Sequence, residues 1–376
     1  AYDNTILHVV CCADTEVFNS RGQRLAQMEM PIPEYLSRNY TQLLREDRYP
    51  RCHKIIPQLP LLAVHSWMSA LQAERLERKT TDILTLVDEL GGAWEDACFR
   101  TLARNFGFGV NGDAFAMWAK SLPLKAVGHH RDDAMQVEAL FLGQSGLLDP
   151  AAAPHGQRER MEADAYYQTL RREYKYLAHK FSLTPMDGTM WKFLRLRPQN
   201  FPYVRLSQLA NLYCGRKAGM SQLLDCDSVE QLREALSSRV SEYWQTHYLF
   251  GVESEKSEKR MSKSSIDVLM VNTVIPMLFA YGRHKHNETL TERAIDFLET
   301  LKPEDNNIVR LWRECGLTVA HAGDSQALIQ LKKEYCDRHK CLICRFGYYF
   351  IKSDPGFLRD DGEDADITNN CHEQDL

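Results

Sequence analysis

The sequence predicts a mainly helical protein with a short α/β element at its amino end. A β-branched, apolar run from Thr5 to Cys12 is typical of a strand buried on both faces of a sheet. After Tyr35, apolar residues recur every three or four positions, which indicates helices. The chain ends in a strongly acidic segment that is typical of a solvated, disordered tail. These features divide the 376 residues into an α/β remnant (1–34), a large helical body (35–352) and an acidic tail (353–376).

The amino-terminal strand needs partners. A second extended segment, Gln23 to Met30, follows it and ends before Pro31. Two strands do not form a stable sheet by themselves. We therefore expect further strands, either from a segment upstream of Ala1 or from a protein partner.

Helical periodicity and capping residues predict the elements of the body. The amphipathic segments are Leu61 to Lys79, Thr81 to Leu90, Trp94 to Phe106, Asp113 to Ser121, Asp133 to Leu142 and Ala165 to Phe181. Capping boxes predict helix starts at Ser228, with Gln231, and at Thr289, with Glu292. Asp324 is predicted to cap a helix that runs to Tyr335.

Charge and hydropathy exclude some classes of protein. The last 24 residues hold eight acidic residues and one basic residue, so residues 1–352 carry a net charge of +2 within the total of −5. A body of that charge gives no strong electrostatic indication of nucleic-acid binding. The longest apolar stretch, Ile266 to Tyr281, is shorter than the roughly 20 residues of a membrane span. It also contains Asp267 and Pro276, so we expect a buried core helix and no membrane contact.

Cysteines form the first candidate site. The chain has eleven of them at irregular spacing, which excludes a secreted disulfide scaffold and indicates the reducing cytoplasm. Cys336, Cys341 and Cys344 are spaced as metal ligands, and a fourth ligand would be His339, Cys315 or Cys52. Zinc or an iron–sulfur cluster fits this pattern. The alternative is a helix end that packs through buried thiols.

Arginines form the second candidate site. Arg195 and Arg197 precede Pro198 and can line one edge of an extended segment. Arg205 and Gln208 share a face of the following helix. These side chains, beside Phe201 and Tyr203, suit the phosphates and bases of a nucleic acid.

The other interpretation of the arginines is structural: they pair with buried acids such as Glu138 or Glu173 and fix the packing of helices. His8, in the first strand, either faces a functional site or is a satisfied core histidine. No Walker loop and no Gly-x-Gly-x-x-Gly after a strand is present in the sequence.

Several stretches resemble a bacterial family, domain of unknown function 2851. The resemblance covers the whole chain. The stretches are Tyr2 to Val10, Leu102 to Gly107, Glu138 to Gln144, Arg195 to Pro202, Asn272 to Pro276, Asp324 to Lys332 and the three-cysteine segment. None of these stretches brings a reaction with it.

The resemblance implies an upstream segment. Full-length members of the family begin earlier, with Gly-Pro-Asp-Phe and then Gly-Asn-Val-Glu-Ile-His. That order is similar to the Asp…Glu-x-Lys core of restriction-type nucleases, which hold Mg²⁺ on paired carboxylates. By this resemblance residues 1–34 are the remnant of a truncated restriction-nuclease-like sheet. Mg²⁺ would bind only when the upstream segment is present.

The same resemblance bears on the cysteines. Some iron–sulfur nucleases of that superfamily close the catalytic domain with one early and three late cysteines. Cys52 with Cys336, Cys341 and Cys344 is similar in outline, although the spacing and order differ.

Two functional hypotheses follow. The first is the accessory helical portion of a nuclease-like, nucleic-acid-processing protein, whose catalytic carboxylates lie upstream and which is inactive alone. The second is a non-enzymatic helical interaction module, or adaptor, whose strands are completed by a protein partner.

Overall fold

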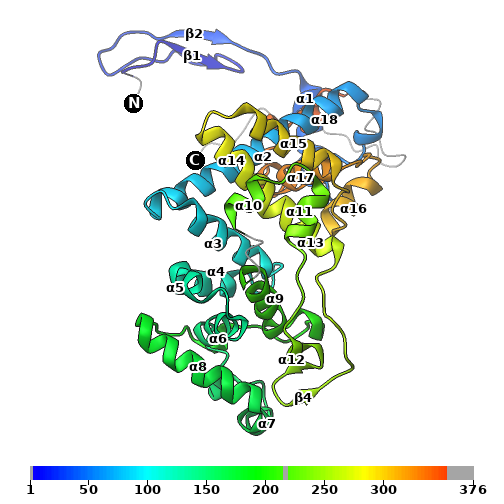
Figure 1. Ribbon diagram of the computed structural model, residues 1–376. Coiled ribbons are helices and arrows are strands. Elements are labelled where there is room, and N and C mark those ends of the chain that lie inside the picture. Colours follow the sequence, from blue (N-terminus) through cyan, green and yellow to red (C-terminus); the bar gives the residue numbers. More distant parts are fainter. Residues whose placement is uncertain (1–2, 215–218, 354–376) are drawn as a thin grey trace. The chain divides into compact units, whose positions relative to one another are not determined.

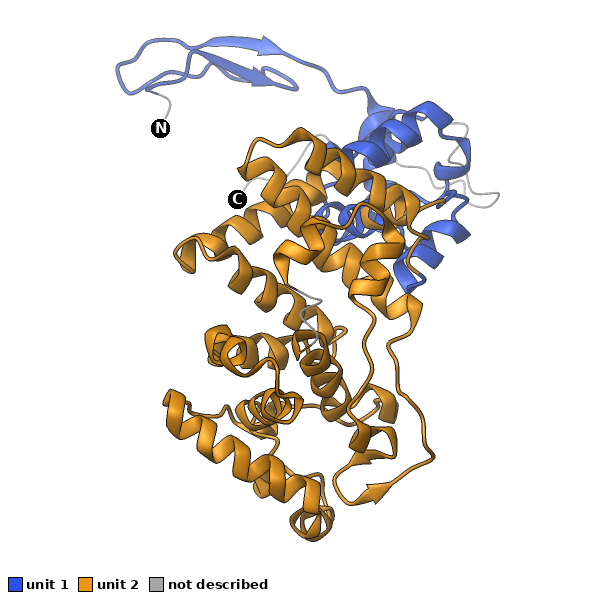
Figure 2. Ribbon diagram, viewed as in Figure 1, with its two compact units in different colours: residues 1–71, 305–319, 327–376 blue, residues 72–304, 320–326 orange. Residues whose placement is uncertain are grey.

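The computed structural model describes residues 3–214 and 219–353. The predicted acidic tail therefore lies, apart from Ser353, outside the described residues. The chain divides into two compact units (Figure 2). Unit 1 comprises residues 1–71, 305–319 and 327–376, and unit 2 comprises residues 72–304 and 320–326. The predicted helical body is thus shared between two units, each with its own hydrophobic core.

Unit 1 is built from both ends of the chain (Figures 1 and 2). The α-helix α2 (Leu61–Glu89) continues from unit 1 into unit 2, and α17 (Ala322–Gln330) begins in unit 2 and ends in unit 1. The other elements of unit 1 are β1 (Leu7–Val10), β2 (Ala26–Glu29), α1 (Glu34–Arg45), η1 (Ile56–Gln58), α16 (Asn307–Glu314), the π-helix η6 (Leu331–Cys336), η7 (Cys341–Ile343) and α18 (Arg345–Lys352).

The core of unit 1 joins these distant segments. Trp312 of α16 and Phe346 of α18 are both buried, with ring centroids 6.3 Å apart. The amide of the buried Asn39 in α1 donates to the carbonyl oxygens of Ile351 (3.0 Å) and Ser353 (3.1 Å). These bonds satisfy carbonyl groups at the end of α18 that have no partner within the helix.

Strands β1 and β2 form a two-stranded parallel sheet, in which Leu7 pairs with Ala26 and Val10 with Glu29. The prediction of burial on both faces is wrong for the first strand. Leu7 and Val9 are each 46% exposed, because β1 has a strand partner on one side within the described residues. Ile6 and Met28 are also exposed, so the apolar sequence of this sheet is not matched by burial.

Unit 2 is almost entirely helical. Its remaining elements are α3 (Trp94–Phe106), α4 (Gly112–Ser121), α5 (Leu124–His130), α6 (Ala134–Gln144), η2 (Pro150–Ala152), α7 (Arg158–Ala163), α8 (Ala165–Phe181), η3 (Gly188–Met190), η4 (Pro198–Asn200), α9 (Pro202–Cys214), α10 (Met220–Leu224), α11 (Val229–Ala235), α12 (Glu242–Gln245), β3 (His247–Leu249), β4 (Val252–Glu253), α13 (Lys263–Leu269), the π-helix η5 (Met270–Val274), α14 (Ile275–His284) and α15 (Glu288–Thr300).

Helix α6 lies in the centre of the unit 2 core. Its residues from Val137 to Gln144 are all buried. Gly143 lies inside α6, where a Cβ atom would come within 2.0 Å of the Tyr174 ring on α8. Gly143 thus allows α6 and α8 to pack closely, and the Tyr174 hydroxyl donates to Gln144 Oε1 at 2.9 Å.

The apolar stretch around Ile266 is a core helix, as predicted. Helices α13, η5 and α14 form one continuous helix over Lys263–His284, which is long and apolar enough to cross a membrane by length and composition. In its most apolar window, however, 72% is buried inside the protein. Most of this helix is therefore covered by the protein itself, as expected for a core helix.

The helix predictions agree with the structure for most elements, and one predicted start fails. Ser228 caps α11 by accepting from the Gln231 N–H, as predicted. Helix α15 is instead capped by Asn287, whose side chain accepts from the Leu290 N–H, so the predicted start at Thr289 is wrong. Asp324 lies in the first turn of α17 and accepts from the Ala320 N–H at 2.8 Å.

Glu138 is a buried carboxyl group in α6 without an ion pair among the described residues. It accepts hydrogen bonds from the Tyr166 hydroxyl (2.8 Å) and the Trp244 indole N–H (2.6 Å). Burial raises the pKa of Glu138 above its ordinary value of 4.5, although these hydrogen bonds act in the opposite direction. At a pH between the unfolded and native pKa values, Glu138 is therefore protonated in the folded protein and ionised in the unfolded chain.

We expect the Glu138→Gln variant to lose a pH dependence of stability. The native pKa is raised, so the contribution of Glu138 is complete below pH 4.5 and declines as the pH rises towards the native pKa. A glutamine can still accept from Trp244 and stays neutral. Denaturant unfolding from about pH 4 to about pH 8 should show the wild type losing stability relative to the variant. Parallel stability curves would contradict this assignment.

Candidate metal centre

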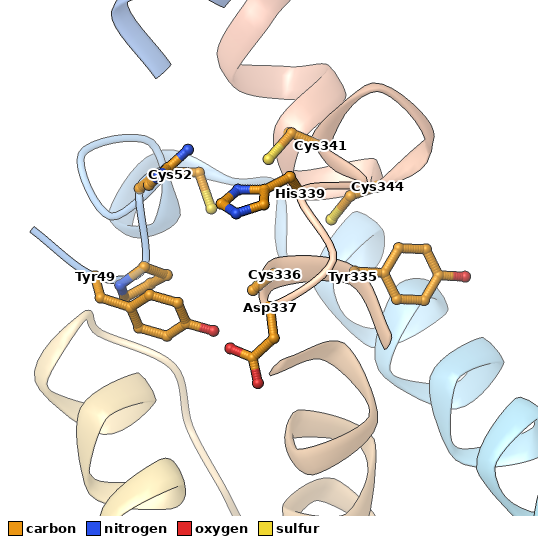
Figure 3. A pocket seen from close by; sticks show the side chains of 11 residues that line it. Tyr49, Cys52, Tyr335, Cys336, Asp337, His339, Cys341 and Cys344 are labelled. Carbon is orange, nitrogen blue, oxygen red and sulfur yellow. The ribbon is translucent and has the colours of Figure 1, made fainter. Parts of the chain in front are cut away.

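The four predicted cysteines line one cavity of unit 1, of about 310 Å³ (Figure 3). Cys52 lies in the turn that follows Tyr49, far from the others in the sequence. Cys336 ends the π-helix η6, Cys341 begins η7, and Cys344 is the N-cap of α18. The thiols thus reach the same cavity from four separate local structures. His339 also lines the cavity, whereas Cys315 is buried in the core of unit 1 and does not.

The backbone between these cysteines is closely held. His339 has a left-handed φ of 53°, and its N–H donates to the Cys336 carbonyl oxygen at 3.1 Å. The Lys340 N–H donates to Tyr335 O at 2.8 Å, which turns the chain back after the π-helix. Cys341 follows directly and begins η7. The turn therefore brings Cys341 back to the cavity that Cys336 lines.

Gly347 fixes the approach of η7 to α18. A Cβ atom at this position would lie 2.2 Å from the Cys341 carbonyl oxygen, so only glycine allows this contact. Cys344, at the N-terminus of α18, has the electrostatic environment that favours a thiolate. In particular, the N–H groups of Gly347 and Phe346 act to lower the pKa of this thiol, although its burial raises the pKa overall.

Burial dominates the acid–base chemistry of the thiols. It raises the pKa of Cys52 well above the ordinary value, and the neighbouring thiols of Cys344, Cys336 and Cys341 raise it further. Burial likewise raises the pKa of Cys336 to about 12. Without a positive charge between them, the thiols stay protonated at neutral pH. A cation bound in the cavity would reverse this preference, because it stabilises thiolates.

Two buried donors beside the thiols make no hydrogen bond of regular geometry among the described residues. They are the Tyr49 hydroxyl and the Trp67 indole N–H. Tyr49 acts to lower the pKa of the neighbouring Cys336, and Trp67 that of Cys344. In both cases burial outweighs this effect and raises the pKa of the thiol. Buried donors are rarely left without an acceptor, and a thiolate is a far better acceptor than a thiol. The cavity thus has donors suited to charged sulfur atoms.

The cavity volume bears on the kind of metal centre that the cysteines could hold. Among the described residues, no group of three or more His, Cys, Asp or Glu side chains is arranged to hold a metal ion. A tetrahedral zinc site draws four sulfur atoms to about 2.3 Å from one centre. A [4Fe–4S] cluster instead binds each thiolate at a different iron atom, so its four ligands surround a larger body. A cavity of about 310 Å³ has room for a cluster of this kind.

Tyr49 and Trp67 have no sequence signal that would have identified them. Both lie outside the cysteine segment, and neither belongs to a ligand motif. Trp67 is held by the edge of Tyr335 (ring centroids 5.3 Å apart) and by the Arg345 guanidinium, 5.0 Å from its ring centroid. Figure 3 shows the ring of Tyr335 pointing away from the cysteines. Only the folded arrangement relates these side chains to the thiols.

The residues of the predicted arginine site differ in burial: Arg205 and Gln208 are buried, whereas Arg195 and Arg197 are exposed. Arg205 is buried in α9, where it donates to Gln208 Oε1 (2.9 Å) and Asn200 Oδ1 (2.7 Å) and lies 4.4 Å from the Phe108 ring centroid. Gln208 is also buried and donates to Lys259 O at 2.7 Å. Burial removes both residues from a nucleic-acid surface.

The alternative prediction, that the arginines pair with buried acids, is also wrong for Arg205. Arg205 donates to amide groups and lies over an aromatic ring, and its buried Nε has no hydrogen-bond partner among the described residues. Glu138 instead binds Tyr166 and Trp244. Burial lowers the pKa of Arg205 to about 10.

Arg195, Arg197 and His8 lie apart from the buried pair. Arg195 and Arg197 are exposed on the segment before η4, and Arg195 has a left-handed φ of 63°. They stay predictions as nucleic-acid contacts. His8, in β1 of unit 1, is half-buried, and its Nδ1 lies 3.5 Å from Gln27 Nε2. Its predicted role stays a prediction.

We expect Gly347→Ala to distort the cysteine cavity. Because the new Cβ atom would collide with backbone rather than with a flexible side chain, η7 must move away from α18. The cost should be about 1–3 kcal/mol of unfolding free energy, as for other overpacked sites. Denaturant unfolding measures it, with Gly112→Ala as the control, since the nearest atom to its Cβ is 3.4 Å away. Equal stability of the two variants would disprove this role of Gly347.

Comparison with known proteins adds a family. Neither the curated proteins nor the solved structures include a match to this chain. The model of the family described as protein of unknown function (DUF2851) matches residues 1–307. That range includes Cys52 and ends before Cys336, so the match does not extend to the three late cysteines. On this match, which covers most of its length, the chain belongs to the DUF2851 family.

Proposed function

We propose that this protein binds an iron–sulfur cluster through Cys52, Cys336, Cys341 and Cys344. The observation that carries the proposal is the convergence of these four thiols on one cavity, which Tyr49 also lines. The buried Tyr49 hydroxyl and the Trp67 indole N–H beside Cys344 support it as donors. When bound, the cluster would supply negatively charged sulfur atoms as acceptors for Tyr49 and Trp67. Its thiolate ligation needs reduced cysteines, in keeping with a cytoplasmic location, and the described cysteines are all free.

The cluster would close unit 1. It would link the turn at Cys52, which follows α1, to the late segments η6, η7 and α18. A link between segments so far apart in the sequence restricts the unfolded chain more than a local link does. The role we assign to the cluster is therefore to hold unit 1 together, and no redox step is required for it.

We infer that the wider role is nucleic-acid processing, as the accessory helical portion of a nuclease-like protein. The support is the order of one early and three late cysteines, which is similar to the closure of iron–sulfur nucleases. The exposed apolar residues of β1 and β2 also support a sheet that further strands complete. An adaptor completed by a protein partner shares this last observation but gives no role to the cysteine cavity.

Metal analysis of the full chain tests the proposal. Protein purified without oxygen, or reconstituted with ferrous iron and sulfide, should contain iron and acid-labile sulfide. Serine substitutions at Cys52, Cys336, Cys341 or Cys344 should each remove most of both. A folded wild type without metal would disprove the site. Stoichiometric zinc without sulfide would disprove the cluster and retain the four ligands.

Two matched controls test whether the four cysteines are the ligands. Cys315→Ser removes a buried thiol from the same core but outside the cavity, so it should retain wild-type iron. His339→Ala removes the histidine that lines the cavity and should also retain iron, because four thiolates complete the set. Loss of iron in His339→Ala together with retention in Cys52→Ser would show that the fourth ligand is wrong.

We also expect Tyr49→Phe to shift the reduction potential of the bound cluster to a more negative value. The hydroxyl would donate to charged sulfur, and hydrogen bonds to sulfur favour the more reduced cluster. Protein-film voltammetry or a dye titration measures the shift. Tyr348→Phe, on the exposed side of α18, should leave the potential unchanged. Equal potentials in wild type and Tyr49→Phe would disprove the hydrogen bond.

A further inference from the structure

A second cavity lies within unit 2 and contains none of the four cysteines. It is a groove of about 540 Å³. Its walls come from α2, α3 and α4, and its floor includes Asn272 of η5 and Pro276 of α14. The groove thus brings together segments separated by more than 150 residues of sequence.

Pro276 explains the wide turn at the floor of the groove. Proline has no N–H group, and its ring collides with the carbonyl group four residues earlier in a regular α-helix. That carbonyl belongs to Asn272, which lies in the π-helix η5. Asn105 of α3 replaces the missing donor: its Nδ2 lies 3.0 Å from Asn272 O and 2.8 Å from Thr273 Oγ1. π-Turns of this kind are frequent at functional sites.

Lys79 of α2 also holds the floor. Its ammonium group donates to Asn272 Oδ1 at 3.1 Å and approaches Val271 O at 3.4 Å. The Asn272 side-chain amide is oriented in turn by its bond to Val268 O at 3.0 Å. A lysine and two asparagine side chains therefore form an ordered polar base within the groove.

Cationic side chains exceed acidic ones around the groove. The lining includes Arg100, Arg104 and Lys120 in addition to Lys79, against the acids Asp82 and Glu89. Among the described residues, Arg100 and Lys120 have no ion-pair partner. The pair of Arg104 with Asp113 is 3.8 Å long, with both side chains mostly exposed, so it holds Arg104 weakly. The positive charges of Arg100 and Lys120 are therefore not paired with an acid among the described residues.

We propose that this groove binds the phosphates of a single nucleic-acid strand. Arginine forks and lysines are the side chains that recognise phosphate oxygens, and the amide floor can bind phosphate or sugar oxygens beside them. Four cations spread over three helices suit successive phosphates better than one small anion. The inference rests on the nucleic-acid part of the proposed function, but not on the cluster, because the groove lies wholly within unit 2.

The groove differs from the surface that the sequence predicted for nucleic acid. Arg195 and Arg197 do not line it, and Arg205 is buried elsewhere in unit 2. Arg100 and Arg104 are instead one turn apart on α3, so their side chains lie on the same face of the helix. Neither guanidinium is held by a buried acid, so both can turn toward a strand in the groove.

Binding of labelled single-stranded oligonucleotides to the full chain tests the proposal. The Arg100→Glu, Lys120→Glu double variant should bind at least tenfold more weakly than wild type at low salt. Its salt dependence should also be less steep, by about 0.7 in the slope of log K against log salt for each phosphate that the variant no longer neutralises. Arg172→Glu, an exposed arginine on α8 outside the groove, carries the same kind of charge change and should bind as wild type.

Additional arms separate the other outcomes. A variant with Arg195→Glu and Arg197→Glu should bind as wild type, and loss of binding in it alone would assign the strand to that loop instead. Inorganic phosphate or a mononucleotide that binds while oligonucleotides do not would also overturn the proposal. Thermal unfolding and iron content confirm that each variant is folded. Normal iron with no oligonucleotide binding by wild type would disprove the groove and leave the cluster intact.

Discussion

Unit 1 depends on the burial of thiols from distant parts of the chain in one cavity. Cys52 and Cys336 are separated by 284 positions, and the helices of unit 2 lie between them in sequence. In the metal-free protein these thiols behave as small apolar side chains, and burial keeps them protonated. The same burial makes them effective ligands once a cation is present, because water cannot compete with the thiolates. The arrangement of the thiols is therefore compatible with both predicted interpretations, as packed thiols and as the ligands of the proposed cluster.

Local periodicity was sufficient to predict helices but not always their limits. The predictions for α3 and α8 match at both ends, since apolar spacing and terminal residues agree there. The predicted break near Thr81 is absent, because Thr81 and Thr85 hydroxyls donate to carbonyl oxygens one turn earlier and fit within α2. The burial of β1 could not be predicted from its apolar residues, because burial depends on neighbouring strands that a sequence pattern does not specify.

For the candidate sites too, the sequence predicted what depends on local spacing and missed what depends on contacts between distant segments. The spacing of Cys336, Cys341 and Cys344 indicates one site, since all three lie within nine residues. The spacing does not distinguish Cys52 from Cys315 as the fourth cysteine of the site. Only the family resemblance or the folded structure does so. Arg205 shows the opposite case: its sequence neighbourhood suits a phosphate, but Phe108 from a distant loop covers it. Aromatic and amide partners of this kind carry no recognisable spacing.

The two π-helices have different causes and a similar consequence. At η5, Pro276 removes one hydrogen bond of a regular helix, and Asn105 supplies a replacement. At η6, no proline is present, and the π-helix ends at Cys336. One extra residue in a helix rotates everything after it by about 100°. Without that residue, Cys336 and the turn beyond it would point to a different face of the helix, away from Cys52. The wide turn at η6 thus sets the face of the helix on which Cys336 lies.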